Sequence, residues 1–376
     1  MAEKRRKRRI IFVQYTNPGA YPPLQHSSRI LAEAGWEVWF VGAESFGSRL
    51  LHLPPHPSIR VTQIPRPRDN KAGPISYLRF CLLVLWIVIR WQPDWIYASE
   101  MLSSLPALVA SLVARKRVIF HEHDSPVSLT GGLFYRTRRW LARRARLNVL
   151  PSEVRARAFR EQTGAAAVEV VWNCPSTSEV AGPKDERQGL FVLHYHGNIS
   201  PKLFPLSVVE ALPSLPDNVV LRIVGYETAG NIGCGQKIME AATALGVASR
   251  VTIMPPVSRW ELLDICRDAD VGLALFPEAT SAADSYAGAS NKVFDYMCSG
   301  LAVLITASTE WVGFLADQNC ALSCEPSDPH SISAVILWFY NHRRDTQAMG
   351  ESGRVRILQS WNYEAQFAPV WNLLKS

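Results

Sequence analysis

The feature that most limits the fold of this chain is a strand-then-helix rhythm that runs along its first half, stops, and starts again. Helices are expected between the strands, for example over 25–34 and 105–114, where apolar residues recur at spacings of three and four. Short apolar runs typical of buried strands are found at 9–15, 37–41, 94–98, 117–120 and 147–150. Such alternation is typical of a parallel sheet with helices on both faces, so the first half predicts one Rossmann-like α/β domain.

The rhythm stops at 174–189, a segment poor in large apolar side chains that contains two prolines and two glycines. This composition is typical of a linker. The rhythm restarts beyond it, with strands expected at 190–195, 219–224, 251–254, 271–275 and 302–305. The sequence therefore predicts a basic tail (1–9), an N-terminal Rossmann-like domain (10–173), a linker (174–189), a C-terminal Rossmann-like domain (190–360) and a last helix (361–376) that packs back across the linker.

Composition supports packed domains and excludes several classes of protein. Hydrophobic residues make up 48% of the 376 residues and charged residues 19%, which argues against long disorder. The seven cysteines are scattered and odd in number, which favours reduced thiols and a cytoplasmic location. No signal peptide is recognised. The apolar stretch 80–89 is about half a membrane span, and predicts a buried helix or at most a surface-seeking one.

The net charge of +7 is the sum of a basic first half and an acidic second half. Residues 1–189 carry 28 Lys and Arg against 15 Asp and Glu, whereas residues 190–376 carry 12 against 18. Nine arginines lie between Arg136 and Arg160, with Glu153 as the only acid among them. A basic run of this kind can be a solvated face, or a surface for an anionic membrane or an anionic acceptor. Nucleic-acid binding is not expected, because no recognition module accompanies the charge.

Ligands of open parallel sheets collect at the carboxyl ends of the strands, so residues just after each predicted strand are the candidates. If the two domains face each other, these residues line a cleft. In the first domain they are Gly19, His121 and Glu122, and in the second they are Gly197, Asn198, Gly225, Met254 and Pro255.

Two segments of the second domain carry the pattern of an anion site. Gly197 and Asn198 follow a strand and precede a helix, and Lys202 adds a cation nearby. In the second segment, small residues lead into a helix whose first turn could offer backbone N–H groups and an ammonium to a diphosphate, while Asp295 could accept hydrogen bonds from a diol. An ordinary capped helix with a solvated acid explains the same residues. The residues before Asp295 are Gly288, Ala289, Ser290, Asn291 and Lys292.

This second segment resembles the glycosyl transferases group one family of retaining GT-B enzymes. Its Asn291–Met297 stretch matches the family's Asn-Lys-x-Phe-Glu-Tyr-Met with only the acid changed, since Asp295 stands for the glutamate. Gly300 and Ala302-Val303 match the glycine and the Pro-Val that follow in the family. The resemblance covers residues 190–374 well and the first half more loosely.

The resemblance implies a GT-B fold of two facing Rossmann-like domains and transfer of a sugar, with retention and without a metal, from a nucleoside-diphosphate sugar to an acceptor hydroxyl. Asp295 would bind the ribose, the backbone around Ser290 to Lys292 the phosphates, and Met254 to Pro255 the base. Asn198 replaces the family's arginine, so Lys202 would carry more of the charge.

In the first domain, His121 matches the family's histidine close to the transferred sugar, with Glu122 beside it. The first glutamate of the family's pair is Ala287 here, which puts the donor sugar in question; Asp284 could supply the missing contact. No metal site is expected. The pair Cys320 and Cys324 is not followed by a second Cys/His pair at suitable spacing, and Asp268-Ala269-Asp270 lies between a helix and a strand, where acids are commonly solvated. The resemblance to GT-B enzymes, which do not need a metal, implies the same.

The expected partners are a nucleotide sugar as co-substrate, with no other cofactor, and an acceptor that is a saccharide, a lipid-linked molecule or a small molecule. Peripheral contact with the inner face of the membrane through the basic half is a further expectation. Two other functions stay open: an epimerase-like enzyme that modifies nucleotide sugars, and a catalytically weak nucleotide-sugar-binding protein.

Overall fold

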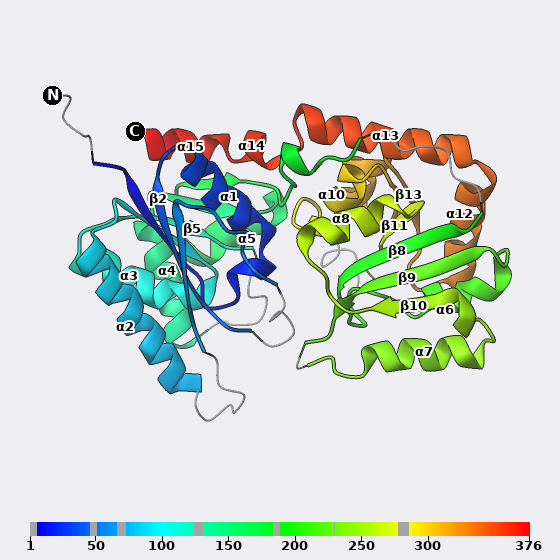
Figure 1. The fold of residues 1–376 in the computed structure, drawn as a ribbon, viewed down its shortest axis with the longest axis horizontal. Coiled ribbons are helices and arrows are strands. Elements are labelled where there is room, and N and C mark those ends of the chain that lie inside the picture. The colour runs from blue at the N-terminus through cyan, green and yellow to red at the C-terminus, as the bar shows by residue number, and fades with distance from the viewer. Residues whose placement is uncertain are drawn as a thin grey trace. The chain divides into compact units, whose positions relative to one another are not determined.

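A computed structural model describes residues 6–45, 51–65, 73–123, 131–182, 189–228, 230–276 and 286–376. The chain divides into two compact units (Figure 1). The first comprises Met1–Trp172 together with Tyr363–Ser376, and the second comprises Asn173–Asn362. Each unit is an α/β layer structure built on its own parallel sheet.

The first unit contains a seven-stranded parallel sheet in the order β3-β2-β1-β4-β5-β6-β7. Its strands are β1 (Arg9–Val13), β2 (Glu37–Ala43), β3 (Ile59–Ile64), β4 (Trp95–Ser99), β5 (Arg117–His121), β6 (Leu147–Leu150) and β7 (Val168–Val170). Its helices are α1 (Pro22–Glu33), α2 (Gly73–Trp91), α3 (Ser104–Val113), α4 (Gly132–Arg144), α5 (Glu153–Thr163), α14 (Tyr363–Gln366) and α15 (Ala368–Lys375).

Strand β1 shows why these sequences form buried strands. Ile11 and Val13 point to one face of the sheet and pack in a core with α2, α3, α4 and α5, whereas Ile10 and Phe12 point to the other face and pack with α1, α14 and α15. Since helices cover both faces, a strand in the middle of the sheet can be apolar at every position.

The second unit contains a six-stranded parallel sheet in the order β10-β9-β8-β11-β12-β13. Its strands are β8 (Phe191–Asn198), β9 (Val219–Tyr226), β10 (Val251–Met254), β11 (Val271–Ala274), β12 (Ala302–Thr306) and β13 (Ala321–Cys324). Its helices are α6 (Ser207–Ala211), α7 (Cys234–Ala244), α8 (Arg259–Arg267), α10 (Asn291–Cys298), α11 (Thr309–Trp311), α12 (Pro329–Asn341) and α13 (Arg343–Gln359).

The two faces of this second sheet differ in chemistry. Leu193 and Tyr195 of β8 point into an apolar core shared with α6, α7 and α12. His194 and His196 alternate with them and point to the opposite face, where they meet Cys266 of α8 and Tyr296 of α10. The polar side chains of β8 are therefore buried under α8 and α10.

The predicted α/β fold is confirmed, and every strand expected from the sequence has a counterpart. The sequence reading missed β3, β7 and β13. The pattern of β3 is weak because none of its residues is fully buried, and β7 has only three residues.

Residues 174–182, the described part of the segment expected to be a linker, pack within the second unit. They include a short 3-10 helix (Thr177–Glu179) that ends in a buried glutamate. The helix expected over 361–376 is two short helices in the core of the first unit.

Candidate functional site

The carboxyl end of β8 is shaped by two glycines. Gly197 has φ +113°, a conformation that favours glycine, and it pairs with Gly225 of β9. A Cβ atom on Gly225 would lie 2.0 Å from the carbonyl oxygen of Gly197. Both glycines therefore lie inside strands, beyond the strand ends expected from the sequence, and they allow the two strands to approach closely.

Lys292 lies against this end of β8. Its Nζ atom is 4.1 Å from the ring centroid of Tyr195 and 5.7 Å from that of Phe276. The hydroxyl of Tyr195 donates to the carbonyl oxygen of Asn198 at 2.6 Å. These contacts bring Lys292, in the first turn of α10, to the turn that follows β8.

The ammonium of Lys292 is buried and has no hydrogen-bond partner among the described residues. Burial lowers the pKa of this lysine to about 7. The side-chain oxygens of Asn291 and Asn198 are likewise buried without a partner in the part of the chain that the structure describes. Because buried polar groups are nearly always paired in proteins, three unpaired groups in adjoining segments mark a place where a polar or anionic ligand fits.

Contacts within the second unit fix the loop that leads into α10. Asn173 donates from its backbone to Gly288 O at 3.0 Å and from its side chain to Ala289 O at 2.7 Å. Tyr286 stacks on Phe276 with ring centroids 4.7 Å apart. Ser290 occupies the N-cap position, yet its side chain makes no capping hydrogen bond. The positive end of α10 is therefore not occupied by its own cap side chain.

Asp295 lies one turn further along α10, in a buried ion-pair network. Arg259 donates to its Oδ1 at 2.7 Å, and Nε2 of His196 is 3.1 Å from its Oδ2. Arg259 also donates to both carboxylate oxygens of Glu179, at 2.8 and 3.1 Å. Burial alone would raise the pKa of Asp295, but the charge of Arg259 and the hydrogen bonds from His196 and Arg259 hold this pKa well below its usual range.

The position of Asp295 on α10 predicts a carboxylate that accepts from a ribose diol. In the structure Asp295 lies inside the unit, where it connects α10 to α8, β8 and the segment around Glu179. A carboxylate oxygen can accept two hydrogen bonds, so each oxygen keeps a lone pair beyond these contacts.

Beneath Asp295, His194, His196 and Cys266 form the one cluster with metal-ligand geometry that was found among the described residues. The nitrogens of the two histidines are 3.3 Å apart, and Cys266 Sγ is 3.3 and 3.6 Å from them. Burial lowers the pKa of both histidines and raises that of Cys266. His196 is neutral and donates to Asp295 through Nε2, so its Nδ1 is an acceptor for a hydrogen bond from His194. Hydrogen bonds therefore explain why the three side chains lie together.

In the first unit, His121 ends β5 and is fully buried. Its Nδ1 shares a hydrogen bond of 2.7 Å with the hydroxyl of Tyr97, while its Nε2 has no partner within the described residues. Burial, with a smaller contribution from His123, lowers the pKa of His121 well below its usual value. His121 is therefore neutral and has one ring nitrogen left for a ligand.

Glu122, the next residue, is engaged inside the unit. Both of its carboxylate oxygens accept from Arg138, each at 2.7 Å, and both side chains are fully buried. Arg138 also donates to Gln162 at 3.0 Å and lies over the ring of Phe159. This bidentate pair joins the end of β5 to α4 and α5, so the geometry gives Glu122 a structural role.

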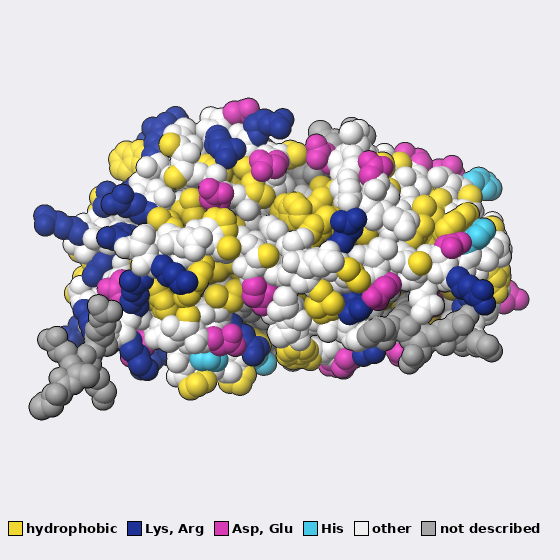
Figure 2. All heavy atoms as spheres, turned by 90° about the horizontal axis from the view of Figure 1, so that it is seen from above, with side chains coloured by type: hydrophobic (Ala, Val, Ile, Leu, Met, Phe, Trp, Pro, Cys, Tyr) yellow, Lys and Arg dark blue, Asp and Glu magenta, His cyan; other side chains and the backbone are white. Residues whose placement is uncertain are grey.

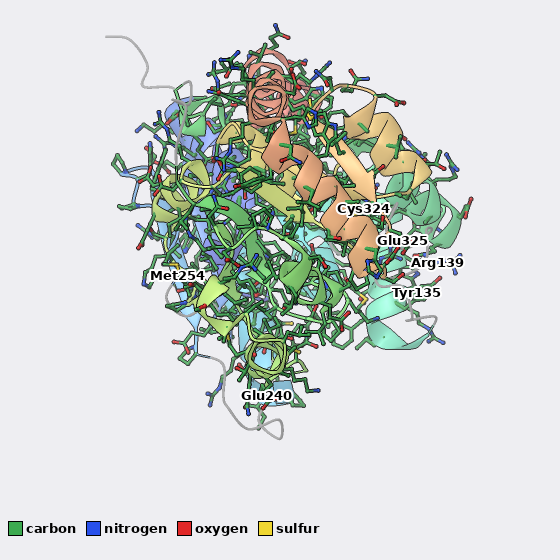
Figure 3. All side chains as sticks on the ribbon, turned by 90° about the vertical axis from the view of Figure 1, so that its right-hand side faces the viewer. Tyr135, Arg139, Glu240, Met254, Cys324 and Glu325 are labelled. Carbon is green, nitrogen blue, oxygen red and sulfur yellow. The ribbon has the colours of Figure 1, made fainter. Side chains whose placement is uncertain are left out.

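The remaining sequence-predicted residues lie apart from these contacts. Gly19 lies in a 3-10 helix (Pro18–Ala20) of the first unit, and a Cβ there would meet the backbone of Leu51 and His52 at 2.7 Å. Met254, which Figure 3 labels, is the last residue of β10, and Pro255 follows it. Lys202 is exposed in the turn before α6, a helix of only five residues.

Sequence reasoning missed Arg259, His196 and Glu179. Arg259 is the first residue of α8, where a positive charge opposes the helix dipole, and this mismatch signals a residue held there for another reason. Glu179 closes a capping box with Ser176, a pattern that indicates local structure in the expected linker.

Comparisons with known proteins give matches to glycosyltransferases. Residues 24–179 match the model of Glycosyltransferase Family 4. D-inositol 3-phosphate glycosyltransferases from Mycobacterium sp. strains KMS and JLS are 32% identical over 80 residues. That stretch covers 21% of this chain, and the chain spans only 18% of the length of these relatives.

Similarity to solved structures extends along nearly the whole chain. Sucrose-phosphate synthase from Thermosynechococcus elongatus has a TM-score of 0.77 at 14% identity, over 98% of both chains. HepE from Anabaena in complex with UDP and glucose has a TM-score of 0.75 at 18% identity, over 98% of this chain and 99% of that one. HepE has also been solved with UDP-glucose. The chain thus has the α/β GT-B fold of these structures, and its residues 24–179 match a glycosyltransferase family.

Proposed function

We propose that this protein is a glycosyltransferase that moves a hexosyl-type sugar from a nucleoside-diphosphate sugar to an acceptor hydroxyl. The observation that carries the proposal is the buried, unpaired ammonium of Lys292 at the start of α10, next to the end of β8. The match to a glycosyltransferase family model and the UDP and UDP-glucose bound to HepE support the same ligand class.

A diphosphate satisfies the unpaired ammonium of Lys292, and hydroxyl groups of the ribose or the sugar can donate to the unpaired side-chain oxygens of Asn198 and Asn291. The diphosphate oxygens accept from the ammonium of Lys292 and from the first-turn backbone of α10, and a charge-assisted hydrogen bond of this kind is worth about 1.5–3 kcal/mol. The backbone of Gly288 to Asn291 and the turn at Gly197–Asn198 complete the phosphate site in this proposal. Met254 and Pro255 hold the base.

Lys292 replaces Lys202 as the main cation of the proposed site. Lys202 is exposed, and screening by water weakens the attraction of an exposed charge. An anion bound next to Lys292 raises the pKa of its ammonium above about 7, so the lysine is fully charged when the donor is bound.

In the proposed reaction, the bond between the sugar C1 and the diphosphate oxygen breaks as the acceptor oxygen bonds to C1. The acceptor proton passes to the departing diphosphate on the same face of the sugar, which gives retention. Negative charge grows on the leaving diphosphate, so a fixed ammonium and helix amides stabilise the transition state more than the ground state. These groups supply the positive charge, and we propose that the reaction needs no metal.

Two further roles belong to the proposal. Asp295 accepts from a ribose hydroxyl through the lone pairs that Arg259 and His196 leave. His121, neutral and with a free Nε2, orients the transferred sugar. Gly19, in the 3-10 helix after β1 of the first unit, keeps a donor-binding role in this proposal. We assign Glu122 no catalytic role in this proposal, because Arg138 donates to both of its carboxylate oxygens.

The acceptor in this proposal is a saccharide, a lipid-linked molecule or a small molecule, and the protein works in the cytoplasm at the inner face of the membrane. The experiment that tests the donor site is calorimetric titration of the full chain with UDP, ADP and GDP. At least one nucleotide should bind, and Lys292→Met should weaken its binding by about tenfold or more. Lys202→Met serves as the matched control and should have a smaller effect. Equal binding by the Lys292→Met variant and the unmodified protein would sink the assignment.

Asp295→Asn tests the ribose contact separately. If Asp295 touches the ribose, the variant should lose affinity for UDP and keep its affinity for inorganic pyrophosphate. Parallel losses for both ligands would show that Asp295 only holds the network around Arg259.

Product analysis separates transfer from the two other functions. An epimerase releases an altered sugar without an acceptor, and a binding protein leaves UDP-sugar intact. Slow release of UDP from UDP-glucose, with no epimerised product, is the expected result.

A further inference from the structure

Helix α2 presents an apolar stripe to solvent. Five of its large apolar side chains are 46–59% exposed: Ile75, Leu78, Leu82, Trp86 and Ile89. They recur at spacings of three and four residues, so they form one stripe roughly 80° wide along a helix about 28 Å long. An exposed apolar stripe of this length is unusual on a soluble domain and marks an interaction surface.

The opposite side of α2 is fixed in the core of the first unit. Phe80, Val84, Ile87 and Val88 are fully buried there together with side chains of the sheet. By length and composition α2 is the one helix among the described residues that could span a membrane, with a mean hydropathy of 1.6 over a window that is 28% buried. Because four core side chains anchor it, α2 lies on a surface and does not cross it.

The neighbouring helices extend the apolar surface. Helix α2 packs on α3, and α3 packs on α4, so the three helices form one layer on the same side of the sheet (Figure 1). Leu112 and Val113 of α3 and Leu133 and Trp140 of α4 are 51–65% exposed.

The charge of this layer is of one sign. The segments 73–91, 104–117 and 132–146 contain no Asp or Glu. Figure 3 labels Arg139 on α4. The view of Figure 2, taken from above, shows further Lys and Arg side chains on the first unit but does not single out α2, α3 and α4. The cations at the surface of these segments are Arg79, Arg90, Arg115, Lys116, Arg117, Arg136, Arg139, Arg143, Arg144 and Arg146.

A groove between α3 and α4 combines both chemistries. It has a volume of about 670 Å³. Its apolar walls are Leu108, Leu112 and Trp140, and its cationic walls are Arg115, Lys116, Arg117, Arg143, Arg144 and Arg146. Arginine matches phosphate oxygens in geometry and charge, while Leu112 and Trp140 offer an apolar rim next to them.

We propose that the exposed face of α2, α3 and α4, the docking face, binds an anionic lipid bilayer, with a lipid phosphate in the groove between α3 and α4 and the α2 stripe immersed among the acyl chains. Charge complementarity favours this occupant: anionic headgroups neutralise the cations while apolar residues enter the hydrocarbon boundary. A second copy of the chain fits less well, because an isologous dimer would place these cations against each other.

The test is co-sedimentation of the full chain with vesicles of phosphatidylcholine, with and without phosphatidylglycerol. We expect binding to the anionic vesicles to exceed binding to the neutral ones by about tenfold or more, and to weaken with added salt. Leu82→Ser/Trp86→Ser removes the centre of the stripe and Lys116→Ser/Arg146→Ser removes part of the groove charge; each should reduce binding by about tenfold.

The matched controls replace exposed apolar and basic residues of the second unit by serine. Ile232→Ser/Leu358→Ser changes two exposed apolar residues of the second unit, and Arg344→Ser changes an exposed arginine. Both should bind vesicles as the unmodified protein does. Thermal unfolding of every variant verifies that the fold is intact.

Three outcomes overturn the proposal. In the first, vesicle binding survives in the folded Leu82→Ser/Trp86→Ser variant. In the second, inositol hexakisphosphate binds as tightly as the vesicles and the stripe variant leaves both unaffected, so the groove is only an anion site. In the third, light scattering shows a dimer that the stripe variant dissolves, so the face is a subunit interface.

Discussion

The two units share one topology and differ in where they leave chemistry unsatisfied. Each sheet places its first strand in the middle and adds strands outward in the same order. In the first unit the strand-end acid Glu122 is fully paired, His121 keeps one buried ring nitrogen without a partner among the described residues, and α2 exposes an apolar stripe. In the second unit an ammonium at the start of α10 is buried without a partner among the described residues. The shared topology determines where ligands can gather, and the side chains favour an anion in the second unit and a surface contact in the first.

Arg138→Ala should have the largest effect on stability. It leaves the Glu122 carboxylate buried and unpaired, which costs about 3–5 kcal/mol, measured as the free energy of unfolding in urea. Arg139→Ala, one residue away and exposed, should cost almost nothing. If Arg138→Ala left stability unchanged, Glu122 would be an open group, and the contrast between the two units would disappear.

Gly225→Ala tests the strand end of the second unit. The new methyl group would lie 2.0 Å from Gly197 O, so the backbone must shift. We expect a loss of about 1–3 kcal/mol in stability together with weaker nucleotide binding. Gly230→Ala is the control, because a Cβ there meets nothing within 4 Å. Undisturbed nucleotide binding in a destabilised Gly225→Ala protein would remove the end of β8 from the site.

The buried ammonium also predicts how stability depends on pH. The pKa of Lys292 is about 7 in the folded state and 10.5 as its ordinary value. Between pH 7 and pH 10.5, Lys292 is protonated in the unfolded chain and deprotonated in the folded chain. The destabilisation by Lys292 is therefore complete below pH 7 and decreases as the pH rises towards 10.5. The unmodified protein should therefore gain stability relative to Lys292→Met as pH rises through this window, by at most about 1.4 kcal/mol per pH unit. Urea unfolding of both proteins at several pH values measures the difference.

Protonation of Lys292 should also make the affinity for nucleotide depend on pH. Above pH 7 the side chain of Lys292 is uncharged before the nucleotide binds, so binding of a diphosphate must take up a proton and affinity falls as pH rises. Calorimetry in buffers of different ionisation enthalpy detects this uptake, which should be absent in Lys292→Met. Proton uptake of equal size in the variant would assign the titration to another group.

The smallest effect is expected on the surface of α2. Leu82→Ser should change stability by less than about 0.5 kcal/mol, because Leu82 is 57% exposed. Val84→Ser, two residues further along and fully buried, should cost several times more. Similar losses at both positions would mean that the stripe supports the fold and is not held ready for a partner.

The sequence predicts the fold well because both units depend on periodic burial, which leaves a local pattern along the chain. It predicts the site less well because burial and long-range pairing leave no such pattern. Lys202 follows a glycine turn and Lys292 begins a helix, and the sequence alone cannot show that the second is buried. The partners of Asp295 lie 36 residues away at Arg259 and 99 away at His196.

The apolar run at 80–89 is a second example of what the sequence alone does not predict, here the exposed side of a helix. A continuous apolar helix gives no sign of which side is covered, so Phe80 and Leu82 look alike in the sequence and differ completely in exposure. The two resemblances lie in different parts of the chain: the motif resemblance is strongest in residues 190–374, whereas the model of Glycosyltransferase Family 4 matches residues 24–179.

The hydrogen bonds of Asn173 have a consequence for donor binding in the proposed reaction. Asn173 is the residue at which the chain passes into the second unit, and it grips the loop that precedes α10 through Gly288 and Ala289. Any rearrangement of that loop during donor binding would have to stretch or break these two hydrogen bonds. The proposed donor site is therefore tied to the first residue of the second unit by direct contact.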